Sequence, residues 1–222
     1  MLNSILTKYY ASFARITRFD LINGKVGHLD FSIYNPALAY LDLANLAQMQ
    51  KYIEQVLYQQ DAVVGIGGYA EERNVYEKSP VFDAKKGSRS IHLGVDIWLL
   101  TGEPIFAPTA GKVHSFQNNA SFGDYGPTII LEHTIEDITF YTLYGHLSLE
   151  SLSGLSVGKY IETGEQIATI GAPIVNGNWI PHLHFQIITD MLGKHGDFYG
   201  VAPKDELAYY LSLCPNPALM IR

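Results

Sequence analysis

From about residue 90 onwards, the chain is a succession of short apolar runs separated by Gly, Pro or polar turns, and this pattern constrains the fold most. The runs are rich in β-branched and aromatic residues, which suit a pleated, half-buried surface. In order they are IHLGVDIWL, PIFAPTAGKVHSF, GPTIILEH, ITFYTLYGHL, KYIETGEQIATI and LHFQII. Short strands at this spacing favour an antiparallel, mainly β domain over alternating β and α units.

The first 75 residues have a different texture. The Asn23-Gly24 pair lies between apolar runs in residues 19–34, which is typical of a hairpin turn. Apolar residues then recur at helical spacing, so residues 37–59 are expected to form an amphipathic helix. Gly65, Gly67 and Gly68 mark a loop. The sequence therefore predicts an N-terminal α/β appendage over residues 1–75 and a mainly β domain over 76–222.

Charge and composition exclude several classes of function. The chain has 222 residues and a formal net charge of −7, which argues against nucleic acid as a partner. Its single cysteine, Cys214, cannot form an internal disulfide. The sequence shows neither a secretory signal nor an apolar run long enough to span a bilayer. We therefore expect a cytoplasmic protein, or a periplasmic or cell-wall associated one if another route exports it; its oligomeric state is left open.

Four of the eight histidines lie in three short segments that carry most of the chemistry. These segments are HLGVD from His92 to Asp96, YGHL around His146, and PHLHF with His182 and His184. On a strand, residues two apart project from the same face, so His182 and His184 can both face one cleft. Gly94 permits a tight bend that lets His92 and Asp96 converge.

The residue types point to a metal. Zinc accepts histidine and aspartate, and three protein ligands with a fourth position open to water is the layout of a catalytic site. A single His-x-His pair on a strand is more often a packing or surface feature. Three separate segments that carry histidine within one β-rich domain favour metal binding over packing, so together they predict a metal site.

The stretch from His92 to Ile188 resembles the lysostaphin-type (LytM-domain) metalloendopeptidases of bacterial cell-wall metabolism. HLGVD is similar to the family's H-x-G-x-D opening, YGHL to its Y-x-H-L segment, and PHLHFQI to its closing P-H-L-H-F-E. VGKYIETGEQIATIG resembles its V-G-x-x-V-x-x-G-x-x-I-x-x-x-G stretch. The order and separations agree over nearly half the chain.

This resemblance implies a fold, a cofactor and a function. The fold is an antiparallel β-sandwich-like domain of the duplicated hybrid motif type, with Zn²⁺ on the floor of a substrate groove. The zinc ligands would be His92, Asp96 and His184. His146 and His182 would be catalytic, with His182 preferred as base and His146 as oxyanion donor. The implied activity is hydrolysis of a peptide amide bond, in peptidoglycan cross-links or stem peptides.

Two features depart from the family or leave other readings open. The loop before the closing motif carries Asn176, Asn178 and Trp179 in place of a small Ser-Thr-Gly run. The stretch from Asp124 to His133 is similar to one in related domains fused to kinase-like and aminotransferase domains, so a cytosolic peptidase on another substrate is an alternative.

An inert zinc- or peptide-binding module and a phosphoryl carrier that uses histidine are further alternatives. Asp96 argues against the carrier, which has no use for a metal-ligating carboxylate. By analogy with some relatives, a residue before the domain such as Asn74 could occupy the fourth zinc position, so that residues 1–75 would inhibit the site.

Overall fold

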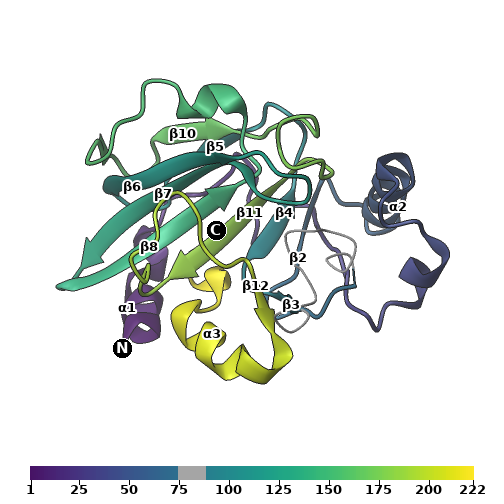
Figure 1. The fold of residues 1–222 in the computed structure, drawn as a ribbon, viewed down its shortest axis with the longest axis horizontal. Coiled ribbons are helices and arrows are strands. Elements are labelled where there is room, and N and C mark those ends of the chain that lie inside the picture. The colour runs from purple at the N-terminus through teal and green to yellow at the C-terminus, as the bar shows by residue number, and fades with distance from the viewer. Residues whose placement is uncertain (75–88) are drawn as a thin grey trace.

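An eight-stranded sheet forms the centre of the computed structural model, which describes residues 1–74 and 89–222 (Figure 1). All neighbouring strands in it are antiparallel except the first pair, β1 and β2, which are parallel. In sheet order the strands are β1 (Val26–His28), β2 (Val64–Gly67), β4 (Val95–Trp98), β11 (His182–Ile188), β8 (Ile138–Gly145), β7 (Gly126–Ile135), β6 (Gly111–Asn119) and β9 (Tyr160–Ile161).

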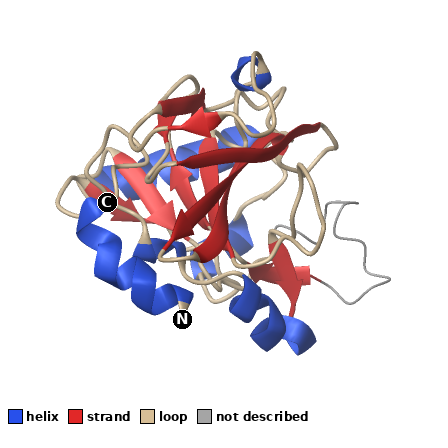
Figure 2. Cartoon of the chain, turned by 90° about the vertical axis from the view of Figure 1, so that its left-hand side faces the viewer, coloured by secondary structure: helices blue, strands red, loops and turns tan. Residues whose placement is uncertain are grey.

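Two smaller sheets pair strands that lie far apart in the sequence. Strand β5 (Pro104–Phe106) pairs with β10 (Gln166–Thr169), and β3 (Arg89–His92) pairs with β12 (Val201–Pro203). Figure 2 shows the helices at the periphery of the strands. The expected mainly β, antiparallel, sandwich-like fold is therefore confirmed, and each apolar run named above overlaps at least one strand.

Strand β11 separates the core from the site. Leu183 and Phe185 are fully buried in the main apolar core, together with Ile97 of β4 and Phe140 of β8. His182 and His184 alternate with them and therefore face the opposite side of the sheet. The period of two along one strand thus places two imidazoles on the face that carries the site.

The N-terminal segment is part of the same sheet. Helix α1 (Leu2–Tyr9), which the sequence did not predict, packs Leu2 and Leu6 into the main core. Helix α2 (Leu46–Gln59) lies to one side of the sheet in Figure 1. It begins later than expected, because the side chain of Asn45 caps it by accepting from the backbone N–H of Gln48 at 3.1 Å.

The hairpin predicted over residues 19–34 is wrong. The side chain of Asp20 accepts hydrogen bonds from the backbone N–H groups of Ile22 and Asn23, so Asn23-Gly24 lies in a local turn. The one strand that follows, β1, pairs in parallel with β2.

The loop predicted at Gly65 and Gly67 is also wrong, because both residues lie in strand β2. A Cβ on Gly65 would come within 2.4 Å of the Leu29 side chain, so close packing explains the glycine in this strand.

The C-terminal segment covers the lower edge of the molecule in Figure 1, with helix α3 (Leu207–Leu213) followed by the buried Cys214. Among the described residues, no helix has the length and apolar character needed to cross a bilayer. The division predicted at residue 75 lies outside the described residues and stays a prediction.

Candidate metal centre

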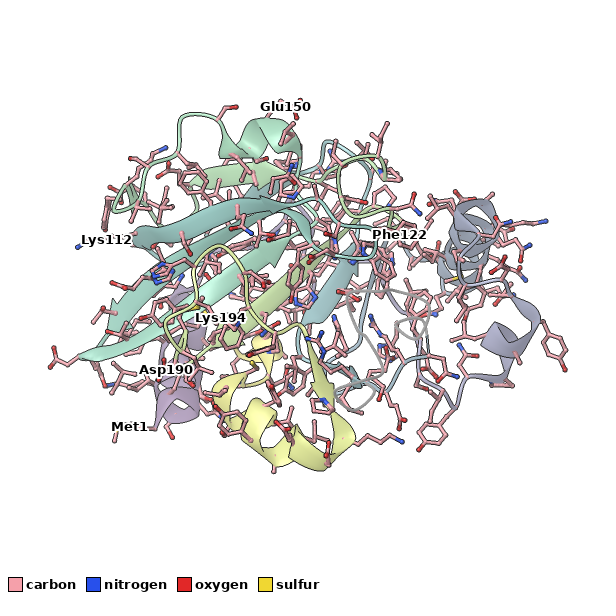
Figure 3. The ribbon with its side chains drawn as sticks, in the orientation of Figure 1. Met1, Lys112, Phe122, Glu150, Asp190 and Lys194 are labelled. Carbon is pink, nitrogen blue, oxygen red and sulfur yellow. The ribbon has the colours of Figure 1, made fainter. Side chains whose placement is uncertain are left out.

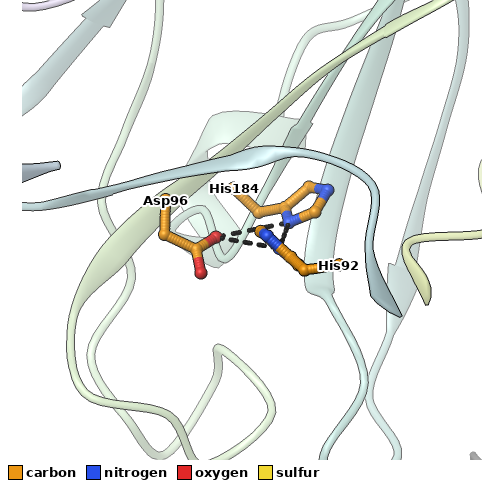
Figure 4. A group of neighbouring side chains, drawn as sticks. All are labelled: His92, Asp96 and His184. Carbon is orange, nitrogen blue, oxygen red and sulfur yellow. Dashed lines mark hydrogen bonds and ion pairs between the residues drawn. The ribbon is translucent and has the colours of Figure 1, made fainter. Parts of the chain in front are cut away.

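His92, Asp96 and His184 converge on one point (Figure 4). His92 ends β3, Asp96 lies in β4, and His184 lies directly opposite Asp96 in the pairing of β4 with β11. His92 Nε2 is 2.9 Å from His184 Nδ1, and Asp96 Oδ1 is 3.3 Å from the first nitrogen and 3.4 Å from the second. All three side chains are buried.

Each imidazole is oriented by an acceptor on its other nitrogen. His92 Nδ1 donates to the carbonyl oxygen of Gly68 at 2.9 Å. His184 Nε2 donates to Gln186 Oε1 at 2.9 Å, because the Gln186 amide nitrogen is directed to the Tyr199 carbonyl and the Cys214 sulfur. In the neutral rings, the nitrogen that faces the centre therefore carries a lone pair.

Three lone-pair atoms thus face one another without a proton between them. Asp96 Oδ1 is buried and accepts no hydrogen bond of normal geometry from the described residues. A buried carboxylate oxygen and two imidazole lone pairs at 2.9–3.4 Å repel unless a cation lies between them. Tetrahedral zinc ligands at about 2.0–2.1 Å from the ion would be about 3.3 Å apart, so the residues present fit this metal.

The second oxygen of Asp96 is held by Arg73. Arg73 Nη1 donates to Asp96 Oδ2 at 2.6 Å, and Arg73 Nε donates to Glu71 Oε2 at 2.5 Å. Burial alone would raise the pKa of Asp96, but His92 and Arg73 outweigh it and hold that pKa well below its usual range. Asp96 is therefore a carboxylate at neutral pH, as metal ligation requires.

Burial has the opposite consequence for His92. Desolvation lowers the pKa of His92 to about 4, although the Asp96 carboxylate acts to raise it. The ring is therefore neutral at pH 7, and its lone pair is available to a metal.

Gly94 makes room for the ligand ring of His184. A Cβ at position 94 would lie 2.5 Å from His184 Cε1 and 2.6 Å from Nε2. We expect Gly94→Ala to displace this ring and to weaken zinc binding by about 10- to 100-fold, the usual range for disturbed support of a ligand. Competition with a zinc chelator measures the affinity, and thermal unfolding of the metal-free form separates this effect from loss of the fold. Unchanged affinity would contradict the steric argument.

His182 and His146 lie next to the three ligand atoms. The centroids of their rings are 4.3 Å apart, and His182 Nε2 is 3.7 Å from Asp96 Oδ1. His182 Nδ1 donates to the Ile180 carbonyl at 2.6 Å, and His146 Nδ1 donates to the Asn176 carbonyl at 2.8 Å. Burial is the main cause that lowers the pKa of both rings, so each Nε2 has a free lone pair at neutral pH.

The loop that departs from the family pattern positions His146. Asn176 is fully buried, and its side chain bonds to Gly171 and to the backbone N–H and carbonyl of Trp179. Its own carbonyl accepts from His146, which has a left-handed backbone with φ of 62° just after the end of β8. Strain of this kind at a non-glycine residue is typical of functional sites.

All five residues predicted from the sequence therefore lie together, and their individual roles stay predictions. Sequence reasoning missed the residues that support them: Arg73, Glu71, Gly68, Tyr125 and Gln186. Asn74 is exposed, and its neighbour Arg73 is the residue that reaches the site, so inhibition by residues 1–75 also stays a prediction.

Comparisons with known proteins bear on the family. An uncharacterized metalloprotease of Haemophilus influenzae is 31% identical over 126 residues, which is 55% of this chain and 24% of that protein. This chain therefore spans about a quarter of the length of the curated relative that it matches.

Solved structures give partial likenesses. A zinc containing peptidase from Vibrio cholerae is 27% identical, with a TM-score of 0.36, over 47% of this chain and 29% of that one. The catalytic domain of lysostaphin from Staphylococcus simulans is 22% identical, with a TM-score of 0.41, over 69% of this chain and 95% of that one.

The family assignment comes from the sequence match across the site. Residues 90–196 match the model of peptidase family M23, and this segment includes every one of the five site residues from His92 to His184. This segment, just under half of the chain, therefore matches peptidase family M23, in agreement with the lysostaphin-type family that its motifs predicted.

Proposed function

We propose that this chain is a zinc-dependent endopeptidase that hydrolyses a peptide amide bond. The match of residues 90–196 to peptidase family M23 supports a metallopeptidase. We further propose that the metal is zinc. By family resemblance, we propose cell-wall peptides as the substrate class. The observation that supports it most is the set of three convergent lone-pair atoms on His92, Asp96 and His184, which needs a cation.

The chain's own residues can supply the proton transfers. Zinc, when bound, would lower the pKa of water at its open position towards about 7 and polarise the scissile carbonyl. His182 suits the role of base, because its Nδ1 is held by Ile180 and its Nε2 is free to accept a proton next to the ligand atoms. His146 has the same arrangement, so it could donate to an oxyanion from Nε2 only after taking up a proton.

Metal-dependent release of amino groups tests the proposal. The full chain would be stripped with a chelator, reloaded with zinc, and incubated with purified cell wall and with defined peptides. We expect about one zinc per chain, new amino groups with zinc, and none after chelation. Zinc binding without hydrolysis of any substrate would favour the inert binding module, and failure to bind zinc would end the proposal.

A further inference from the structure

The metal centre opens into a cavity of about 340 Å³ whose walls differ in polarity. One wall carries charged side chains, namely Arg89, Asp124, Lys194 and Asp197. The other wall is apolar and comes mainly from α2 and the segment before it: Phe31, Leu43, Leu46, Met49, Ile53 and Ile180. We call this second set the apolar wall. In Figure 3, which has the orientation of Figure 1, Phe122 lies on the side of the sheet nearer to α2. Lys194 lies over the strands, farther from α2.

The apolar wall begins directly beside a predicted catalytic residue. The His182 ring stacks on Trp98, with centroids 5.9 Å apart and an interplanar angle of 26°. Trp98 in turn stacks on Phe31 at 5.1 Å and 23°. Trp98 and Phe31 pack in one cluster with Met49 and Ile53 of α2. A substrate held at His182 therefore has the apolar wall as its next neighbour.

Part of the apolar wall stays open towards the cavity. Met49 and Ile53 are buried, whereas Leu43, Leu46 and Ile180 are only partly buried and line the same space. Apolar side chains that are left partly exposed in a concave site gain free energy when a ligand covers them. A glycine residue has no side chain to cover them, and a charged residue would lose its hydration there.

We propose that the apolar wall is a specificity subsite, which takes a substrate side chain of leucine or phenylalanine size next to the hydrolysed bond. This inference rests on the peptidase function proposed above and names its substrate class. The N-terminal segment then selects the substrate, because it provides most of the subsite. Covering one apolar side chain corresponds to a preference of about ten- to a hundredfold in kcat/KM over glycine.

Kinetics on a peptide series tests the subsite. Peptides would differ at one position on either side of the cleaved bond, with Gly, Leu, Phe, Lys or Glu there. The double variant Leu43→Gln/Leu46→Gln is expected to lower the ratio of kcat/KM for Leu over Gly by about tenfold. Leu57→Gln is the matched control, since Leu57 is partly buried on α2 in the same cluster but does not line the cavity. It should leave the ratio unchanged.

Fluorescence provides a second readout that needs no hydrolysis. Both tryptophans of the chain, Trp98 and Trp179, line the cavity. Titrating the chelator-treated protein with Trp-free peptides should therefore change its emission. We expect tighter binding for a peptide with Leu than for its Gly counterpart, with the difference reduced in the double variant and kept in Leu57→Gln.

The outcomes separate this inference from the proposed function. Cleavage with equal kcat/KM for Gly and Leu peptides, or an equal loss for both in the double variant, would overturn the subsite and leave the peptidase intact. Equal effects of Leu57→Gln and the double variant on the ratio would also overturn it. Absence of all cleavage, with selective binding of the Leu peptide in the fluorescence titration, would refute the peptidase and support the subsite.

Discussion

His184→Ala is expected to weaken zinc binding strongly and to reduce hydrolysis with it, whereas His182→Ala should reduce hydrolysis alone. In the proposed site, His184 would supply one of three zinc donors, and its Nδ1 is 2.9 Å from His92 Nε2. If zinc binding is worth about 10–16 kcal/mol, loss of a third of the donors costs about 3–5 kcal/mol, or roughly 10²- to 10⁴-fold in affinity. Loss of a general base costs about 10²- to 10⁴-fold in rate.

Zinc content after dialysis and kcat/KM on one peptide measure the two effects separately. His114→Ala is the control, since His114 stacks on His195 outside the site. We expect it to keep both zinc and activity. Equal zinc content in His184→Ala and the unmodified chain would contradict the ligand assignment. Zinc loss in His182→Ala would instead mean that this ring belongs to the ligand set.

Arg73→Met is expected to destabilise the metal-free protein strongly. The substitution removes the guanidinium that Asp96 Oδ2 contacts at 2.6 Å. The buried carboxylate of Asp96 then lacks its partner in this ion pair. Removing one partner of a buried ion pair costs about 3–5 kcal/mol. For a chain of this size, that corresponds to a fall of about 6–20 °C in Tm. Bound zinc should reduce this fall in Tm, because it supplies positive charge to the same carboxylate.

Thermal unfolding with and without zinc measures this prediction. Arg73→Lys keeps the charge and should be less destabilising than Arg73→Met. Lys25→Met is the second control, because it breaks the exposed pair between Lys25 and Asp61 and should change Tm little. An Arg73→Met protein as stable as the unmodified chain would show that Arg73 does not hold Asp96. An equal fall in Tm with and without zinc would argue against the idea that Arg73 and zinc both contact the Asp96 carboxylate.

The site residues could be predicted because their signals are local. His92 and Asp96 are separated by three residues, and His182 and His184 by one, so strand geometry and the turn at Gly94 are enough to bring each pair together. The family pattern then connected the segments. Arg73 carries no such signal, because its ion pair with Asp96 spans 23 positions. It depends on the contact of this segment with β3, where the backbone N–H of Arg73 donates to the Ser90 carbonyl at 2.8 Å.

The strands of the β domain could be predicted, whereas those of the N-terminal segment could not. Runs such as GPTIILEH have the β-branched content that identifies a strand. In VGIG of β2 the glycines are required by close packing against Leu29, which is a tertiary effect without a local signature. For the same reason, the Asn23-Gly24 pair was a poor guide, since the turn there is stabilised by the side chain of Asp20.

The environment of Cys214 has a chemical consequence for the metal centre. Its sulfur lies behind His184, where it accepts a hydrogen bond from Gln186 at 3.2 Å. Burial raises the pKa of the Cys214 thiol to about 12, so almost no thiolate exists at neutral pH. The thiol therefore neither competes for zinc nor reacts readily with peroxide or glutathione disulfide. The ligand set can keep its composition equally well in reducing and in oxidising surroundings.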